Sequence, residues 1–482
     1  RMKNCITQVP SNRTERKQKN KGKTREIKQG RKVFICLAWL VIWQLAAFAV
    51  GSELLLPGPL QTLKALGQLV REAGFYIDAA WTVSRCLIAM FLSFAVGIAA
   101  AWTAYKHRTA REFLKLPVSF FKSVPVMAVI IYVILLVSSD FVAVIVCFIM
   151  CFPIVYTNVL GGLDAVSGEY LEVAAVYGLT EAQKLRLIYI PSIRPNLNAA
   201  LRLVCGLSWK AVIAAEVLSI PDFSLGYEMM NAKYYLETER LFAYIAAIVA
   251  LSVLFEKLVM RAASYAEKKA AVRLKAHGEE KEQALAPEIQ LSGISKNYEN
   301  KSVLTDMTIK FESGTVTAVS GPSGGGKTTL AMIIAGLVEA DAGKVEMRGA
   351  ADVKLSFLFQ EDRLLPWLTV YDNMALSRIN DAGHELDAQI RRTAEALELT
   401  EVLFSLPAEL SGGMRHRVAL GRTFLSNANL MILDEPFRGL DEELKERIVQ
   451  RLWKETTKGK TVILISHNSG DCEKLSEKVV LI

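Results

Sequence analysis

The hydrophobic pattern divides the chain into two unlike parts. The first part contains long apolar runs, and a helix that crosses a bilayer needs ~20 mainly apolar residues. Six runs are expected to span, at residues 33–50, 79–105, 117–137, 141–163, 196–220 and 241–261. Further on, a β-branched strand pattern at 315–320 precedes an apolar helical pattern at 330–337. We therefore predict an α-helical membrane domain of six transmembrane helices, followed by an α/β domain.

Composition and charge place the boundaries between these parts. The chain has 482 residues, of which 52% are hydrophobic, and a net charge of +8. Residues 264–287 are rich in Ala, Lys and Glu, which is typical of a charged linker. The predicted organisation is a basic tail (1–32), a transmembrane domain (33–263), the linker (264–287) and an α/β domain (288–482).

The distribution of basic residues predicts the orientation in the membrane. The first 32 residues have 12 Lys or Arg and two acids, and further bases lie at 106–111 and after residue 256. Because cytoplasmic loops carry an excess of Lys and Arg, both termini and the loops 106–116 and 164–195 are expected in the cytoplasm. The tail has no aromatic residues for stacking on bases, so we expect it to bind anionic lipid headgroups and not nucleic acid.

Residues 321–329 (GPSGGGKTT) form a phosphate-binding pattern between the predicted strand and helix. Backbone N–H groups of such a loop, at the positive end of a helix, bind phosphate. Lys327 is expected to reach the β- and γ-phosphates, and Thr328 to ligate Mg²⁺. The loop residues expected to contact ATP are Gly321, Ser323, Gly324, Gly326, Lys327, Thr328 and Thr329.

A second motif supplies acids for phosphoryl transfer. Residues 430–433 form an apolar run, predicted to be a buried strand, that ends in Asp434 and Glu435. Asp434 is expected to hold Mg²⁺ through water, and Glu435 to polarise the attacking water. Phosphoryl transfer needs mainly positioning and charge neutralisation, so these few residues suffice. The scattered histidines and cysteines indicate no other metal site and no disulfide framework.

With residues 410–414 (LSGGM), these motifs resemble the ATPases of ABC transporters. The resemblance identifies 410–414 as the signature motif, which implies that Ser411, Gly412 and Gly413 contact ATP across a dimer. It further implies an adenine-stacking Tyr298, a Q-loop Gln360 with a catalytic and metal-binding role, a D-loop Asp441 and a switch His467. Two departures from the family pattern are His416, where Gln is usual, and Arg438-Gly439, where Ser-Ala is usual. Both positions lie near the dimer interface in the family.

The loop at 164–195 carries a further motif, with Glu172, Ala174, Ala175 and Gly178 followed by a proline at 191. It resembles the cytoplasmic coupling helix of ABC importer permeases. The small residues are expected to let a short helix pack closely into a groove, and Glu172 to fix its orientation.

The string LLPW at 364–367, with permease segments at 56–59 and 201–216, resembles importers of the nitrate/sulfonate/taurine type. The resemblance implies a type I importer-like fold in the inner membrane with a cytosolic ATPase, an ATP hydrolase that drives import of a sulfonate, nitrate, bicarbonate or vitamin precursor. Since one chain holds one permease and one ATPase, it also implies a homodimer, fed by a separate extracytoplasmic solute-binding protein.

Two charges fall inside the fifth predicted span, Lys210 and Glu216. Charges in a membrane usually face protein or water, so both are candidates for the translocation path. Two other functions stay open from the sequence: an exporter-type half-transporter, because exporters often fuse the two domains, and a membrane-anchored signalling ATPase.

Overall fold

The computed structural model describes residues 34–35, 37–269, 285–298, 301–322, 324–379 and 385–482. The chain forms two compact units: Arg1–Gly161 with Asn196–Ala266, and Gly162–Pro195 with Glu267–Ile482. The predicted tail at 1–32 and most of the predicted linker, residues 270–284, lie outside the described residues. We refer to the two assemblies as the helical unit and the nucleotide unit.

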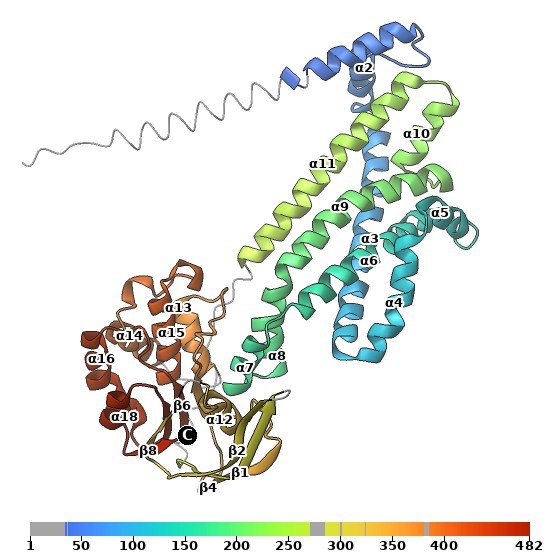
Figure 1. Cartoon of the computed structure of the whole chain (residues 1–482). Helices are drawn as coiled ribbons and strands as arrows, with labels where there is room; N and C mark the ends of the chain where they lie inside the picture. The colour runs from blue at the N-terminus through green and yellow to red at the C-terminus, as the bar shows by residue number, and fades with distance from the viewer. Residues whose placement is uncertain (1–33, 36, 270–284, 299–300, 323, 380–384) are drawn as a thin grey trace, which may run out of the picture. The chain divides into compact units, whose positions relative to one another are not determined.

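The helical unit consists of helices only, within the part of the chain that the structure describes (Figure 1). A short apolar helix at Leu37–Val50 comes first. The following helices are α2 (Pro59–Leu69), α3 (Ala73–Lys106), α4 (Arg108–Ser123), α5 (Val126–Ile134), α6 (Ser139–Asp164), α9 (Ile190–Ser219), α10 (Leu225–Tyr234) and α11 (Thr238–Lys269).

Helices α3, α6 and α11 are long and apolar enough to cross a membrane, among the described residues. They correspond to the runs predicted at 79–105, 141–163 and 241–261, so a transmembrane domain is confirmed. The predicted count of six spans is not confirmed. The first run is shorter than a span in the described residues, and α9, at 196–220, is not among the apolar spanning helices.

The run at 117–137 does not form one straight helix. α4 ends at Ser123 and α5 begins at Val126, with a bend of 100° between them. Val124 has extended backbone angles (φ −72°, ψ 130°). Pro125 follows it, and a proline disfavours the helical conformation of the preceding residue. α4 and α5 therefore form a broken span or a re-entrant pair.

The nucleotide unit contains two sheets (Figure 1). Three antiparallel strands have the order β2-β1-β4, and five parallel strands have the order β5-β6-β7-β3-β8. The strands are β1 (Glu288–Tyr298), β2 (Lys301–Phe311), β3 (Val316–Ser320), β4 (Ala342–Arg348), β5 (Leu355–Leu358), β6 (Leu430–Asp434), β7 (Thr461–Ile465) and β8 (Lys478–Leu481).

Helices of this unit surround the parallel sheet and form a helical layer of their own. The α-helices are α7 (Gly168–Val176), α8 (Glu181–Lys184), α12 (Lys327–Ile334), α13 (Val370–Ala375), α14 (Leu386–Ala396), α15 (Gly412–Phe424), α16 (Glu442–Ile448), α17 (Lys454–Thr457) and α18 (Ser469–Leu475). Two π-helical turns (Leu185–Tyr189, Val449–Trp453) and three short 3₁₀ turns (Leu376–Arg378, Thr400–Val402, Pro407–Glu409) complete it.

The parallel sheet is covered on both faces, which explains why its central strands are uniformly apolar. Along β6, Ile432 belongs to one buried cluster while Met431 and Leu433 belong to another. β7 alternates in the same way. The predicted α/β fold of the second part is therefore confirmed.

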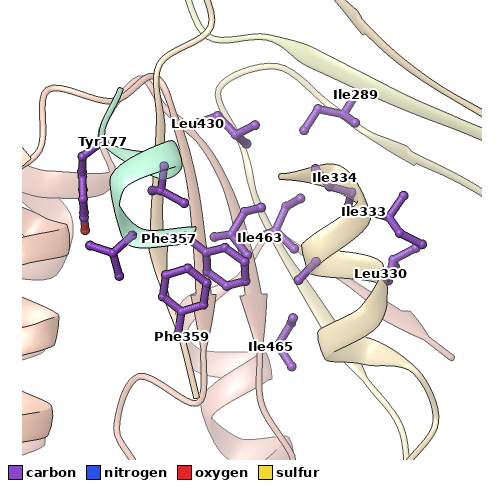
Figure 2. Close-up of a cluster of buried hydrophobic side chains, with 14 of the residues drawn as sticks. Tyr177, Ile289, Leu330, Ile333, Ile334, Phe357, Phe359, Leu430, Ile463 and Ile465 are labelled. Atoms are coloured by element: carbon purple, nitrogen blue, oxygen red, sulfur yellow. The ribbon is translucent and has the colours of Figure 1, made fainter. Parts of the chain in front are cut away.

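One cluster includes residues from a distant part of the sequence (Figure 2). Val173, Ala174 and Tyr177, at the end of α7, are buried with Phe357 and Phe359 of the ATPase sheet region. The two phenyl rings stack with centroids 4.3 Å apart. In Figure 2 the pale green turn that carries Tyr177 lies beside these rings. The loop between α6 and α9 thus contributes to the core of the nucleotide unit.

Candidate functional site

The phosphate-binding loop lies between β3 and α12, as the sequence predicts. Lys327 donates to the carbonyl oxygens of Gly321 and Pro322, at 2.8 and 2.9 Å. Gly326 precedes α12 with a left-handed φ of 86°, and a Cβ there would lie 2.8 Å from the carbonyl oxygen of Val303. Only glycine avoids both the strain and this clash. The loop is therefore shaped by its glycines.

A hydroxyl and a buried carboxylate meet beside the loop. The Thr328 hydroxyl donates to Asp434 at 2.7 Å, and Asp434 is buried at the end of β6. Burial raises the pKa of the Asp434 carboxyl, against the lowering effects of the Thr328 hydrogen bond and of Lys327. Mg²⁺ prefers oxygen ligands, and this hydroxyl and carboxylate supply them. A cation would also compensate the negative charge of the buried carboxylate. These residues fit the predicted metal role.

Glu435 follows directly and is paired with His467. The His467 Nδ1 lies 2.8 Å from the Glu435 carboxylate, which also accepts from the His467 backbone N–H at 3.1 Å. Glu435 has a φ of 53°, a left-handed conformation that a non-glycine residue rarely adopts. Such strained residues gather at functional sites, and here the turn directs the carboxylate toward the loop after β7.

Topology explains why these residues converge. β3, β6 and β7 are adjacent and parallel, with Val319 and Asp434 both paired to Ile465. Their carboxyl ends therefore share one edge of the sheet, the edge where open α/β sheets bind ligands. The phosphate-binding loop, the two acids and His467 each follow one of these strands.

A cavity of about 590 Å³ opens at this edge. Nine of the predicted site residues line it: Gly324, Gly326, Lys327, Thr328, Thr329, Gln360, Asp434, Glu435 and His467. Val303, Gly325 and Arg438 also line it and were not predicted as site residues. Arg438 lowers the pKa of Asp434, although burial outweighs this effect. Arg438 could have been recognised in the sequence as a cation that closely follows the two acids Asp434 and Glu435.

Other predicted site residues do not line this cavity. Tyr298 is half exposed, with the Lys296 ammonium 5.6 Å from its ring centroid. Ser411 caps α15 through the Met414 N–H, with Gly412 and Gly413 in the first turn. Asp441 caps α16. Ser323 lies outside the described residues.

The predicted coupling motif packs against the ATPase loop that follows Gln360. The Glu172 carboxylate forms an ion pair with Arg363. The Arg363 guanidinium also lies 4.0 Å from the centroid of the Phe359 ring. The sequence did not indicate Arg363, because its partner lies 191 positions away.

Trp367 makes a second contact with the same segment. Its indole Nε1 donates to the carbonyl oxygen of Leu187 at 2.7 Å, and its ring meets Tyr170 edge-on with centroids 5.5 Å apart. In the sequence, Trp367 was noted only as part of the LLPW string that resembles one group of importers. The structure places it at the contact between the loop 164–195 and the ATPase.

The small residues of the motif act differently from what the sequence suggested. Ala174 is buried in the core cluster, in agreement with close packing, but Ala175 is exposed. Gly178 has a φ of 61° and nothing within 4 Å of a Cβ built on it. The expectation that Ala175 and Gly178 permit close packing is therefore wrong. Gly178 instead ends α7, where the Leu179 N–H donates to the Ala174 carbonyl oxygen at 2.9 Å.

Both charges predicted for the translocation path lie on α9, in the helical unit. Lys210 is exposed. Glu216 is fully buried and accepts from Arg85 and Thr82 of α3 at 3.0 Å each, and from the Gly226 N–H at 3.2 Å. Arg85 also donates to the backbone carbonyl oxygens of Asp222 and Phe223. Glu216 thus holds α3, α9 and the start of α10 together.

Two family models match the chain. Residues 93–271 match the inner membrane component of binding-protein-dependent transport systems. Residues 304–438 match the ABC transporter family. The two matches lie in the order that the sequence predicted, a permease followed by an ATPase.

Curated relatives match about 40% of the chain. The aliphatic sulfonates import ATP-binding protein of Delftia acidovorans is 37% identical over 212 residues, which is 41% of this chain and 81% of that protein. One from Rhizobium johnstonii is 34% identical over 206 residues, 40% of this chain and 73% of that protein. For another, from Burkholderia lata, the chain spans 60% of its length. A solved dimeric ABC transporter cassette is 26% identical with a TM-score of 0.37, over 40% of this chain and 94% of that one.

Proposed function

This chain belongs to the ABC transporter family, with a permease and an ATPase in one polypeptide, and we propose that it imports a small solute at the expense of ATP hydrolysis. The contact of the loop 164–195 with the ATPase carries this proposal. The loop connects α6 to α9 of the helical unit, its apolar residues are buried in the core of the nucleotide unit, and Glu172 pairs with Arg363 just beyond Gln360. A change around the nucleotide is thereby passed to the helices.

The chemistry of hydrolysis follows from the residues at the sheet edge. The loop amides and Lys327 would bind the phosphates of ATP, and Thr328, Gln360 and Asp434 would hold a magnesium ion, which would supply positive charge to neutralise those phosphates. Glu435 takes a proton from the attacking water, and His467, bound to the Glu435 carboxylate, keeps that carboxylate oriented. Tyr298 would stack on the adenine.

The active form is proposed to be a homodimer. Ser411, Gly412 and Gly413 do not line the nucleotide cavity of their own chain, yet they form the N-terminus of α15, and a helix N-terminus attracts anions. A second copy, facing the first, would place this helix end and its D-loop Asp441 against the γ-phosphate. Each ATP is then held between the phosphate-binding loop of one subunit and the signature of its partner.

The substrate proposed is a small anion of the sulfonate, nitrate or bicarbonate type, or a vitamin precursor. The relatives named above import aliphatic sulfonates, so sulfonates are the first candidates. A separate extracytoplasmic solute-binding protein delivers the solute. Lys210, an exposed cation on α9, is the candidate contact for an anionic solute, and Glu216 the candidate that shapes the path from within. The basic tail faces lipid headgroups, in a cytoplasmic membrane with the ATPase in the cytosol.

The first experiment is the ATPase rate of the chain in liposomes, with and without a solute-binding protein loaded with a sulfonate, nitrate or bicarbonate. Stimulation only by one loaded protein is the expected result, and it would name the solute class. Stimulation by free lipophilic compounds, with no response to any binding protein, would favour an exporter instead.

A further inference from the structure

His416 occupies a position between two parts of the ATPase that the sequence did not connect. It lies on α15, five residues after Ser411, and its side chain is 3% exposed. Its Nδ1 lies 3.1 Å from the Asp362 carboxylate, and its Nε2 lies 3.0 Å from the carbonyl oxygen of Pro436. Asp362 is two residues beyond Gln360, and Pro436 directly follows Glu435. The ring therefore bridges the Gln360 loop and the catalytic turn.

The two neighbours of the ring decide its protonation. A carbonyl oxygen and a carboxylate oxygen both accept hydrogen bonds, and a neutral imidazole has only one N–H to donate. A neutral ring in this place would set a lone pair against one of the two acceptors. An imidazolium donates to both, and its charge is compensated by Asp362.

Other charged groups near the ring are bound elsewhere. Arg422, also on α15, donates to the backbone carbonyl oxygens of Arg363 and Asp362, at 3.0 and 3.3 Å. Arg363 pairs with Glu172, and Glu435 with His467. On α15, Arg415 is exposed and Arg417 binds Glu398. Asp362 is therefore the acid that the ring contacts, among the described residues.

These contacts form one continuous chain through the nucleotide unit. Glu172 binds Arg363, whose neighbour Asp362 binds His416, and His416 binds the peptide that follows Glu435. Arg422 fixes the backbone at the middle of this chain and lies 5.5 Å from the ring of Tyr177. The coupling segment and the catalytic carboxylate are thus linked by charged side chains and two short backbone steps.

We propose that His416, as a buried imidazolium, is a positioning residue for ATP hydrolysis, which fixes the Glu435 turn relative to the loop that receives Glu172. His416 does not line the nucleotide cavity. Its effect is exerted through Pro436 on the orientation of Glu435. This inference rests on the proposed ATP hydrolysis, and the wild-type rate tests that function separately.

The test measures kcat and KM for ATP of the full chain in liposomes between about pH 5 and about pH 8, the interval in which histidine is the side chain that ordinarily changes its charge. His416→Gln keeps N–H donors but does not titrate, and His416→Ala removes them. His107→Gln, an exposed histidine between α3 and α4, is the matched control. We expect His416→Ala to lower kcat about ten-fold with KM within about two-fold, the pattern expected when the orientation of Glu435 is disturbed while ATP binding is retained.

The decisive quantity is the ratio of wild-type kcat to that of His416→Gln. Because His467 is present in both proteins, its contribution cancels in the ratio, and we expect the ratio to fall as pH rises, because a neutral His416 ring cannot donate to both acceptors. Asp362→Asn should move this fall to lower pH, since the compensating charge is gone. A ratio that does not change with pH overturns the proposal, whatever the effect of His416→Ala. If the alanine variant does not fold, the glutamine and asparagine variants still decide.

A double-mutant cycle tests the link to Glu172. If the chain of contacts is continuous, the losses of coupled rate caused by Glu172→Ala and His416→Ala should not multiply, because the first break already releases the second contact. Fully multiplicative losses would refute the link.

Discussion

At the scale of single residues, the site depends on side chains held by one or two specific partners. Thr328 and Asp434 bind each other, and so do Glu435 and His467. The sequence indicated all four residues as site residues, but it did not indicate which of them contact each other. A motif fixes which residues follow each strand, whereas contacts depend on which strands are neighbours.

Glu435→Gln should preserve ATP binding and lower kcat at least about 100-fold, because the amide cannot accept the proton of the attacking water. Nucleotide affinity and hydrolysis are measured on the same preparation. Glu401→Gln, an exposed acid in a short 3₁₀ turn, is the control and should behave as wild type. Normal hydrolysis by Glu435→Gln would remove Glu435 from its assigned role.

Lys460 is a buried cation whose environment opposes its charge. Burial, and then the nearby charge of Arg378, lowers the pKa of Lys460 to about 8, although its ammonium donates to the Ser426 carbonyl oxygen at 3.2 Å. An unfolded lysine keeps its proton up to about pH 10.4. Between about pH 8 and about pH 10.4, the folded protein therefore binds fewer protons than the unfolded chain. Lys460 therefore lowers the free energy of unfolding most below about pH 8, and this destabilisation decreases as pH rises toward about 10.

Lys460→Met should accordingly raise the unfolding temperature at pH 7 and lose this advantage at pH 10. The gain in unfolding free energy is at most about 3 kcal/mol before the lost hydrogen bond is subtracted. Thermal unfolding of wild type and variant at the two pH values checks it. A gain of equal size at both pH values would show that packing, not charge, is responsible.

At the scale of elements, two strands of the parallel sheet, β3 and β6, and the loops that follow them were predictable, and the long-range pairings were not. The motifs at 321–329 and 430–435 predicted strand ends, and the structure brings them to one edge. Glu172 and Arg363 could not be paired from sequence, because nothing local links two residues so far apart in the chain. Pro125 gave a readable signal for a break in the run at 117–137, but the length of apolar sequence favoured one straight span.

Glu172→Gln should reduce solute transported per ATP hydrolysed while leaving nucleotide affinity within about two-fold. The amide keeps the shape of the side chain but weakens the pairing with Arg363. Glu169→Gln, an exposed acid on the same helix α7, provides the matched control. An equal loss of nucleotide affinity would mean that Glu172 serves the ATPase fold and not its coupling.

At the scale of the whole molecule, the composite site predicts that defective subunits complement one another. A Lys327→Ala chain lacks the phosphate-binding loop lysine. In the proposed homodimer, a Gly413→Asp chain would place a carboxylate toward the γ-phosphate held by its partner. Within its own chain, a Cβ at Gly413 meets only the Gly439 carbonyl oxygen, at 3.8 Å, so the fold should tolerate the substitution.

Co-expression of these two chains should restore ATPase activity that neither has alone, because the mixed dimer keeps one intact site. The measurement is the hydrolysis rate of the mixture against each variant separately, with wild type diluted to the same degree as reference. Absence of any recovery, with dimers present by mass, would contradict a site shared between subunits.

The core in Figure 2 also bears on how the protein is made. Residues 162–195 leave the ribosome long before residues 285–482. The segment that contains Tyr177 is therefore already synthesised when the ATPase sheet forms. The ATPase portion then completes its core against a segment anchored by helices on either side. An ATPase fragment made without that segment would leave the surface around Phe357 and Phe359 uncovered, which makes the order of synthesis in one polypeptide part of the protection against aggregation.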